Sequence, residues 1–320
     1  MTDFRVALEA AFGAARVRLD VPLARLTTFR VGGPADLLVE TRSSDEVVSA
    51  LKLAGAAGVP VTILGGGSNV LVSDRGVRGL VIRPRGGKIH RIDRGRVRAD
   101  AAVTVNGLVR WTILHGCAGV EAWAGMPGTV GGGVFGNAHF RGQLMGDLIV
   151  EARLVSRNGT VRDVPTADMG FGDDRSRLPE TGEVVLAAVF RVTPGEPARL
   201  RAVARESLAF RKRTQPLDAP SAGCVFRNPD PADAAAPGPI PRSAGALIDR
   251  AGLKGASIGG AQVSLVHANF IVSDGTATAG DIRLLIERCR STVRERFGVE
   301  LRDEIVYLGD FGGYTACQHC

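Results

Sequence analysis

The spacing of hydrophobic positions predicts a small α/β unit near the start of the chain. Residues 35–40 (ADLLVE) form a short apolar run that is typical of a strand, and residues 44–58 place apolar side chains at helical spacing. Three further short runs, at 61–64, 70–74 and 79–84, are rich in Val, Leu and Ile and predict additional strands.

The middle of the chain predicts mainly antiparallel strands. Residues 85–105 alternate polar and apolar positions, and residues 104–115 change to helical spacing. Residues 150–164 contain two alternating runs around an Asn-Gly pair, which favours a tight hairpin because both residues tolerate positive φ. The apolar run at 184–192 predicts a buried strand.

The last third predicts two helices separated by a surface loop. Residues 198–211 form the first helix candidate, and the proline-rich stretch 228–242 cannot be regular structure, so we interpret it as an insertion in a third domain. The second helix begins near Thr278, whose hydroxyl can cap it together with Asp281. Its apolar stripe includes Cys289, which is therefore predicted to be a core residue.

These patterns together predict an α+β protein of three unequal units without internal repeats. We expect the first unit to span residues 1–85, the second 86–197 and the third 198–310, with residues 311–320 as a flexible tail. A chain of 320 residues is long enough for several packed domains.

The composition argues against nucleic-acid and membrane partners. The chain carries 40 basic and 33 acidic residues, but the basic ones are spread along its length and only 2 tyrosines can interleave with them. No apolar run approaches the roughly 20 residues of a membrane-spanning helix. Asp3 and Glu9 interrupt the segment where a signal peptide would need an apolar core, so we expect a cytoplasmic protein.

The 5 cysteines suggest neither a disulfide framework nor a metal site. They are scattered, and an odd number in a reducing compartment predicts free thiols. Cys317, His319 and Cys320 lie too close together in the sequence to supply a zinc tetrahedron from one chain, so we predict no metal.

The first candidate for chemistry is a glycine cluster that follows the strand predicted at 61–64. Gly65, Gly66 and Gly67 allow close backbone approach, so their N–H groups can converge on a pyrophosphate, and Ser68 and Asn69 add side-chain donors. Neither a Walker loop nor a Rossmann fingerprint fits, because no Gly-Lys-Ser/Thr follows and the third spaced glycine is missing. An ordinary tight turn is the alternative interpretation of these glycines alone.

A second glycine-rich tract, residues 125–138, contains a Pro-Gly turn followed by three consecutive glycines. So many glycines are entropically unfavourable unless a planar or anionic group lies against the backbone. The two tracts therefore predict a large dinucleotide held by main-chain amides from two domains. The second tract would contribute Gly128, Thr129, Gly131, Gly132 and Asn137.

Six blocks of sequence resemble one family of flavoenzymes and follow one another in the order found in that family. The family is the UDP-N-acetylenolpyruvoylglucosamine reductases of peptidoglycan precursor synthesis, and the resemblance is to their shorter subclass. The resemblance implies an FAD-binding type-2 fold (vanillyl-alcohol-oxidase or PCMH-like), in which two α+β domains hold FAD and a third α+β domain binds the substrate. The blocks are residues 27–36, 64–82, 119–138, 221–229, 243–272 and 298–309.

The resemblance also implies a reaction. FAD would accept a hydride from NADPH and pass it to the vinyl carbon of UDP-N-acetylglucosamine enolpyruvate, and the neighbouring carbon would take a proton to give UDP-N-acetylmuramate. The partner is then a small nucleotide sugar. No histidine precedes His90, so the early strands offer no imidazole for a covalent flavin bond, and we expect non-covalent FAD.

The resemblance assigns roles to individual residues. Cys224 occupies the position of the family's serine proton donor, and a thiol with an ordinary pKa of about 8.5 is mostly protonated at neutral pH. Glu304 matches the glutamate that polarises the enolpyruvyl carboxylate beside that donor. Four further residues match blocks that shape the substrate region: Asn228, Gln262, His267 and Asn269.

Two departures from the family pattern bear on activity. Where the family has Phe-Gly-Tyr-Arg, with the arginine stabilising developing negative charge, this chain places Asp173 and Asp174 at the tyrosine and arginine positions. We expect Arg175, in preference to Arg177, to take over that role after a one-residue slip, because a long arginine side chain tolerates a displaced backbone. His139 replaces a family glycine near the flavin, and the sequence suggests no compensation for it.

Two other functions stay open at this point. One is an FAD-dependent oxidase or dehydrogenase of the same superfamily acting on an alcohol, which would not need an acid at Cys224. The other is a flavin-binding homologue with reduced catalysis, which Asp173 and Asp174 would explain because aspartates oppose developing negative charge.

Overall fold

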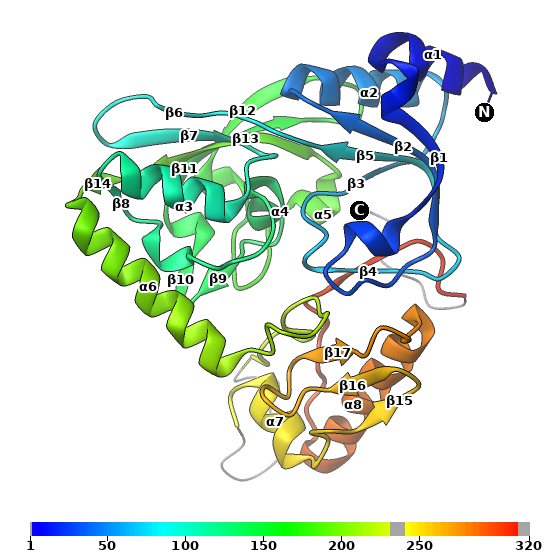
Figure 1. The fold of residues 1–320 in the computed structure, drawn as a ribbon, viewed down its shortest axis with the longest axis vertical. Helices are drawn as coiled ribbons and strands as arrows, with labels where there is room; N and C mark the ends of the chain where they lie inside the picture. The colour runs from blue at the N-terminus through cyan, green and yellow to red at the C-terminus, as the bar shows by residue number, and fades with distance from the viewer. Residues whose placement is uncertain (1, 231–240, 313–320) are drawn as a thin grey trace.

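The computed structural model describes residues 2–230 and 241–312. Most of the predicted tail at 311–320 lies outside the described residues, as does much of the proline-rich loop. Figure 1 shows two sheet-based units side by side in the upper part of the view and a third unit below them. In the described part of the chain, no helix is long and apolar enough to cross a membrane.

The first unit is built on a four-stranded sheet with the order β1-β2-β5-β3. β2, β5 and β3 run parallel, as the predicted α/β unit requires, and β1 adds an antiparallel edge. Two helices, α1 and α2, pack on this sheet through one apolar cluster, and the Ser43 side chain caps α2. The elements are α1 (Thr2–Phe12), β1 (Val17–Pro22), β2 (Pro34–Thr41), α2 (Ser44–Ala56), β3 (Val61–Ile63), β4 (Val70–Val72) and β5 (Val77–Pro84).

The second unit contains a five-stranded antiparallel sheet with the order β12-β11-β13-β7-β6. The predicted hairpin joins β11 to β12, and Gly159 turns it with φ +83°. Trp123 and Phe190 meet edge to face in the core of this unit. The elements are β6 (Ile89–Arg91), β7 (Arg96–Asp100), α3 (Val105–Leu114), β8 (Cys117–Ala118), α4 (Val130–Phe135), β9 (His139–Phe140), β10 (Gln143–Leu144), β11 (Ile149–Val155), β12 (Val161–Pro165), α5 (Leu178–Thr181), β13 (Val184–Arg191) and β14 (Thr193–Pro194).

The second glycine-rich tract forms a helix, α4, which the pattern of residues did not predict. Thr129 caps it, because its hydroxyl accepts a hydrogen bond of 3.3 Å from the Gly132 amide. Val130 and Val134 are fully buried in the core of the second unit. Tertiary packing of these two valines therefore overrides the poor helix propensity of the three glycines between them.

The predicted helix at 198–211 forms as α6 (Pro197–Thr214), but it belongs with the second unit. Leu200 and Ala204 join the hydrophobic core of the second unit. Figure 1 shows α6 running along the edge of that unit toward the third one. The expected boundary at residue 198 therefore places α6 in the third unit, whereas α6 packs against the core of the second unit.

The third unit places α7 and a small three-stranded sheet against α8. The predicted capping box is confirmed, because Thr278 and Asp281 each accept a hydrogen bond from the backbone amide of the other. Cys289 is buried, as its place in the apolar stripe predicted. The elements are α7 (Ala244–Arg250), β15 (Ser257–Ile258), β16 (Ala261–Val263), β17 (Ile271–Ser273), α8 (Ala279–Phe297) and β18 (Val306–Leu308).

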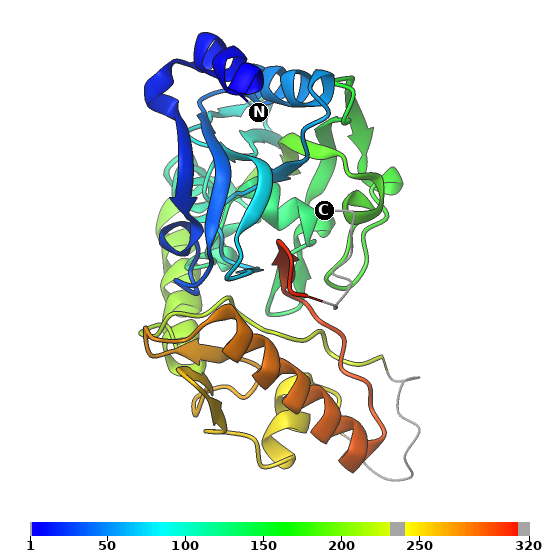
Figure 2. The same cartoon turned by 90° about the vertical axis from the view of Figure 1, so that its right-hand side faces the viewer.

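The last strand, β18, leaves the third unit and pairs in parallel with β4 of the first unit. Figure 2 shows it, in red, extending upward from the third unit. The two units also share one core, in which Phe29, Val31 and Leu71 pack with apolar residues of α7 and α8. The first and third units are therefore joined by backbone pairing as well as by buried apolar surface.

We expect Leu71→Ala to destabilise the whole protein, because Leu71 is fully buried in this shared core. Removing a buried leucine side chain costs about 2–5 kcal/mol. Leu114→Ala is the matched control, since Leu114 is 72% exposed. Chemical denaturation checks both variants, and equal losses of unfolding free energy would contradict the shared core.

Candidate active site

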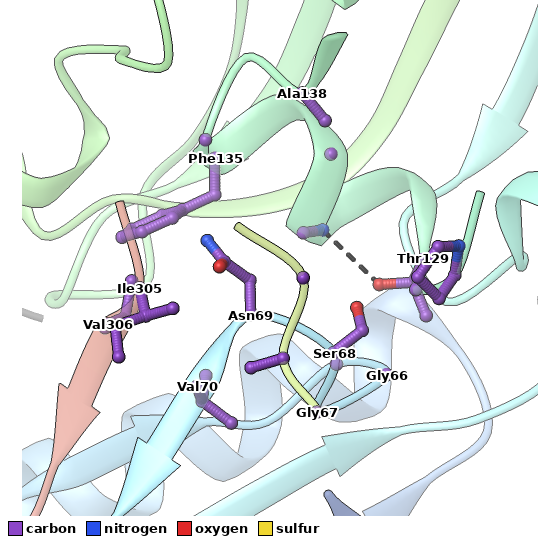
Figure 3. A pocket seen from close by; sticks show the side chains of 18 of the residues that line it. Gly66, Gly67, Ser68, Asn69, Val70, Thr129, Phe135, Ala138, Ile305 and Val306 are labelled. Atoms are coloured by element: carbon purple, nitrogen blue, oxygen red, sulfur yellow. Dashed lines mark hydrogen bonds between the residues drawn. The ribbon is translucent and has the colours of Figure 1, made fainter. Parts of the chain in front are cut away.

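A large cavity lies where the three units meet, with a volume of about 1560 Å³. Both glycine-rich tracts line it, together with segments 219–224 and 303–308. Figure 3 shows the Gly66–Asn69 loop, Thr129 and the Ile305–Val306 segment around the same space. Small-molecule sites are typically about 300–1,000 Å³, so this cavity has room for more than one ligand of ordinary size.

The two glycine-rich tracts contact each other in the cavity wall. A Cβ added at Gly66 would lie 2.6 Å from the Gly128 Cα atom, and one added at Gly65 would lie 2.7 Å from the Thr129 hydroxyl. Gly128 has φ +99°, and its own Cβ would lie 2.6 Å from the Ser68 hydroxyl. Glycine is needed at these positions so that the loops of two units can touch.

Two other glycines have no such explanation within the protein. A Cβ at Gly132 would meet no protein atom closer than 3.6 Å, and one at Gly136 none closer than 3.8 Å. Both residues line the cavity. A helix glycine costs up to about 1 kcal/mol relative to alanine, and Gly132 leaves α4 without a side chain on the side that faces the cavity. A flat group such as a flavin fits this bare wall.

Asn69 joins the first glycine loop to the segment that carries Glu304. Its side-chain amide donates a hydrogen bond of 3.1 Å to the Glu304 carbonyl oxygen, and its own carbonyl accepts one of 3.0 Å from the Val306 amide. In Figure 3 it lies between the Ser68 loop and the Ile305–Val306 segment. Asn69 is a predicted cofactor contact, and in the structure its hydrogen bonds hold the backbone of the segment that carries Glu304.

Cys224 and Glu304 lie on neighbouring backbones. The Glu304 amide donates a hydrogen bond of 2.8 Å to the Val225 carbonyl. Asn269 braces the other side of the cysteine loop, because its amide group donates to Phe226 O and accepts from Phe226 N, at 2.7 and 3.0 Å. Both the thiol and the carboxyl line the cavity.

Both groups hold their protons at neutral pH. Burial, with a smaller effect of the nearby Asp174 carboxylate, raises the pKa of Glu304 to about 8 against the opposing effects of His139 and Arg227. Burial also raises the pKa of the Cys224 thiol well above its ordinary value, with Glu304 and Asp174 adding to the effect. The arrangement can therefore supply protons to a bound ligand.

The structure separates the two arginines that could replace the missing family arginine. Arg175 lines the cavity, as the predicted slip requires. Arg177 instead donates to the buried Glu183 carboxylate at 2.7 Å, and Arg162 contacts the same carboxylate. Arg177 therefore forms a structural ion pair and does not line the cavity.

Asp174 forms an ion pair with His139, the other residue that departs from the family pattern. His139 Nδ1 lies 2.7 Å from Asp174 Oδ1, and both residues line the cavity. Asp173, in contrast, is exposed.

Several predicted site residues lie behind the cavity wall. The Asn137 amide group bonds to the backbone of Gly172 and Gly146, so it ties two loops together. Among the described residues, those that line the cavity include none of the four that were predicted to bind the substrate. The Asn228 side chain accepts a hydrogen bond from the start of α7, Gln262 is exposed, His267 packs edge to face on Phe270, and Asn269 braces the cysteine loop.

The sequence analysis missed Arg211, a buried cation of the cavity wall. Its guanidinium group lies over the Phe140 ring at 4.7 Å, and it lowers the pKa of the Cys224 thiol. Burial lowers the pKa of Arg211 itself. It stands in a run of basic residues at the end of α6, and sequence alone does not show which of them is buried.

The fold and the cavity define an FAD-binding protein of the type-2 class with an added third domain. The family model described as "FAD binding domain" matches residues 35–165. The C-terminal domain of UDP-N-acetylenolpyruvoylglucosamine reductase matches residues 215–308. The chain belongs to the UDP-N-acetylenolpyruvoylglucosamine reductase family, an FAD-dependent oxidoreductase family, and the predicted fold class is confirmed.

The relatives are similar over nearly their whole length. A protein named UDP-N-acetylenolpyruvoylglucosamine reductase 2, from Symbiobacterium thermophilum, is 42% identical and covers 92% of each chain. The reductase of Rubrobacter xylanophilus is 42% identical, over 95% of this chain and 98% of its own. The crystal structure of the Thermus caldophilus reductase aligns with a TM-score of 0.75 and 33% identity, over 92% of this chain and 100% of that one.

We expect Gly132→Ala and Gly132→Val to weaken FAD binding progressively while the apoprotein stays folded. The new side chain projects into the cavity, whereas alanine is a better helix former than glycine by about 1 kcal/mol. Flavin fluorescence titration and apoprotein melting measure the two effects separately. Gly280→Ala in α8, outside the cavity, is the control. Unchanged FAD affinity in both Gly132 variants would show that the flavin does not lie against α4.

Proposed function

We propose that this enzyme uses FAD and NADPH to reduce UDP-N-acetylglucosamine enolpyruvate to UDP-N-acetylmuramate, a step of peptidoglycan precursor synthesis. The observation that carries the proposal is the adjacent Cys224 and Glu304 in a cavity lined by both glycine-rich tracts. A reduction that ends in protonation of carbon needs an acid beside the flavin site. An alcohol oxidase does not need an acid at that position.

The glycine-rich tracts would hold FAD between the first two units. Gly65–Asn69 line the cavity and would offer main-chain amides to the cofactor. Gly131 and Gly132 also line the cavity, but their amides donate to the Ala101 carbonyl and the Thr129 hydroxyl, so the second tract would offer FAD mainly its side-chain-free surface. When bound, FAD supplies the hydride that is taken from NADPH and given to the substrate. The protein encloses this chemistry within the cavity wall and so limits the access of water to it.

Cys224 is the proposed proton donor. Hydride addition to the terminal vinyl carbon leaves negative charge on the neighbouring carbon, and the thiol proton passes to that carbon. Burial keeps the thiol protonated until then. Arg211 favours the thiolate that results, because its positive charge acts on Cys224.

Glu304 is the proposed partner of the substrate carboxylate. With a pKa of about 8 it is largely a neutral acid at pH 7. A neutral carboxylic acid donates a hydrogen bond to a carboxylate without adding like charge. This interaction strengthens as the enolate develops, so Glu304 would assist the same step that Cys224 completes.

An anaerobic experiment tests the proposed reaction. We expect the purified protein to be yellow, NADPH to bleach it, and UDP-N-acetylglucosamine enolpyruvate to restore the colour. Bleaching without restoration by that substrate would favour an oxidase or dehydrogenase of the same superfamily. A yellow protein that NADPH does not bleach would favour a flavin-binding homologue.

Replacing Cys224 separates proton donation from binding. We expect Cys224→Ser to stay active, because a hydroxyl can donate the proton, and Cys224→Ala to slow reoxidation of the reduced enzyme by about 10²-fold or more, the usual scale for a positioned acid. Cys289→Ala is the matched control, because Cys289 is a buried thiol of the third unit outside the cavity. Stopped-flow absorbance of the flavin measures the rates, and an unchanged rate in Cys224→Ala would remove the thiol from the mechanism.

A further inference from the structure

The His139–Asp174 ion pair has no role in the site described so far. The two side chains come from β9 and from a turn 35 residues further along the chain, and both line the cavity. The Asp174 side chain is only 11% exposed, while that of His139 is 38% exposed. The carboxylate is therefore enclosed, and the imidazole is the member of the pair that a ligand can reach.

The backbone holds this pair in place. Asp174 has φ +49°, a strained value for a non-glycine residue, in a turn closed by mutual hydrogen bonds between Gly172 and Arg175 at 3.1 and 3.3 Å. On the other side, Asn137, which stands two residues before His139 in the chain, donates a hydrogen bond of 2.8 Å to the Gly172 carbonyl. The Ser176 hydroxyl donates at 2.6 Å to the carbonyl of the last residue of α4. Both sides of the pair are thus fixed to each other through neighbouring residues.

The charges around His139 favour its protonated form. The hydrogen bond to Asp174 raises the pKa of His139 above its ordinary value, and the charges of Asp174 and Asp173 add to this against the effect of burial. Glu304 adds to it only once its own proton is lost. Nδ1 is used by Asp174, and within the described residues the ring makes no other hydrogen bond. Nε2–H is therefore available to a ligand in the cavity.

Building on the proposed function, we propose that His139 is a cationic hydrogen-bond donor to the carboxylate of the enolpyruvyl substrate, and that Asp174 is the positioning residue that fixes its ring. The proposal rests on the locked ion pair in the wall of the cavity that Glu304 and Cys224 also line. No bond is made or broken by either residue.

This assignment gives a physical account of both departures from the family pattern. Aspartate at position 174 would repel an anionic substrate if it stood alone, but here its charge is matched by the imidazolium at 139. Arg175 also lines the cavity but is exposed, whereas His139 is a positive charge that Asp174 holds in a fixed orientation. A preorganised cation stabilises the developing enolate more strongly than the ground state, so it favours the reaction as well as binding.

Substrate affinity of the oxidised holoenzyme tests the role of His139 without turnover. Calorimetry with UDP-N-acetylglucosamine enolpyruvate at pH 7 should show at least a tenfold loss in His139→Gln and recovery toward wild type in His139→Arg, which keeps a cation. His90→Gln is the control, since His90 lies on exposed β6 and does not line the cavity. Equal affinity of wild type and His139→Gln would overturn the proposal.

The pH dependence of the same affinity separates His139 from Glu304. Wild-type affinity should fall as the pH rises through the raised pKa of His139, because the imidazolium loses its charge. His139→Arg should lack that limb and keep only the one near pH 8 that belongs to Glu304. Asp174→Asn should move the histidine limb to lower pH, and NMR of the His139 ring in the apoprotein should show the same shift. Identical pH profiles for wild type and His139→Arg would contradict the proposal.

Failure of this inference differs from failure of the proposed function. If wild-type protein is bleached by NADPH and reoxidised by the enolpyruvyl substrate while His139→Gln behaves like wild type, the reductase function stands and the role of His139 is wrong. If wild type neither binds nor reduces that substrate, the function itself fails.

Discussion

The return of β18 to the first unit is the constraint on which the site depends. The segment just before this strand is held from two sides, because Glu304 N donates to Val225 O while Asn69 donates to Glu304 O. One contact comes from the third unit and the other from the first. The backbone of Glu304 therefore has a defined position only when the first and third units are packed together, so the site depends on the assembly of the units.

The glycine-rich tracts serve two separate physical purposes. Gly65, Gly66 and Gly128 let loops of the first and second units approach to distances that any Cβ would prevent. Gly132 and Gly136 leave a bare wall that no protein atom fills. The first group closes the scaffold and the second leaves space for a ligand, although both look alike in the sequence.

Sequence analysis predicted the elements whose cause is local. The capping box at Thr278, the hairpin at Gly159 and the strands and helix of the first unit all follow from short-range patterns and are present. The pairing of β18 with β4, and the contact of Asn69 with a residue 235 positions away, leave no local signal. Resemblance to a family supplied Cys224 and Glu304, but it could not show that His139 and Asp174 meet.

The electrostatics of the cavity explain how an anionic substrate can enter a wall that carries several acids. Glu304 is neutral because its pKa lies near 8, Cys224 stays a thiol, and the charge of Asp174 is matched by His139. Arg211 adds a buried positive charge. At neutral pH these groups together carry no net negative charge, and this part of the wall gains negative charge when Glu304 and His139 lose their protons. The protons on Glu304 and His139 are not consumed by the reaction, but they permit an anionic substrate to bind beside the thiol whose proton is consumed.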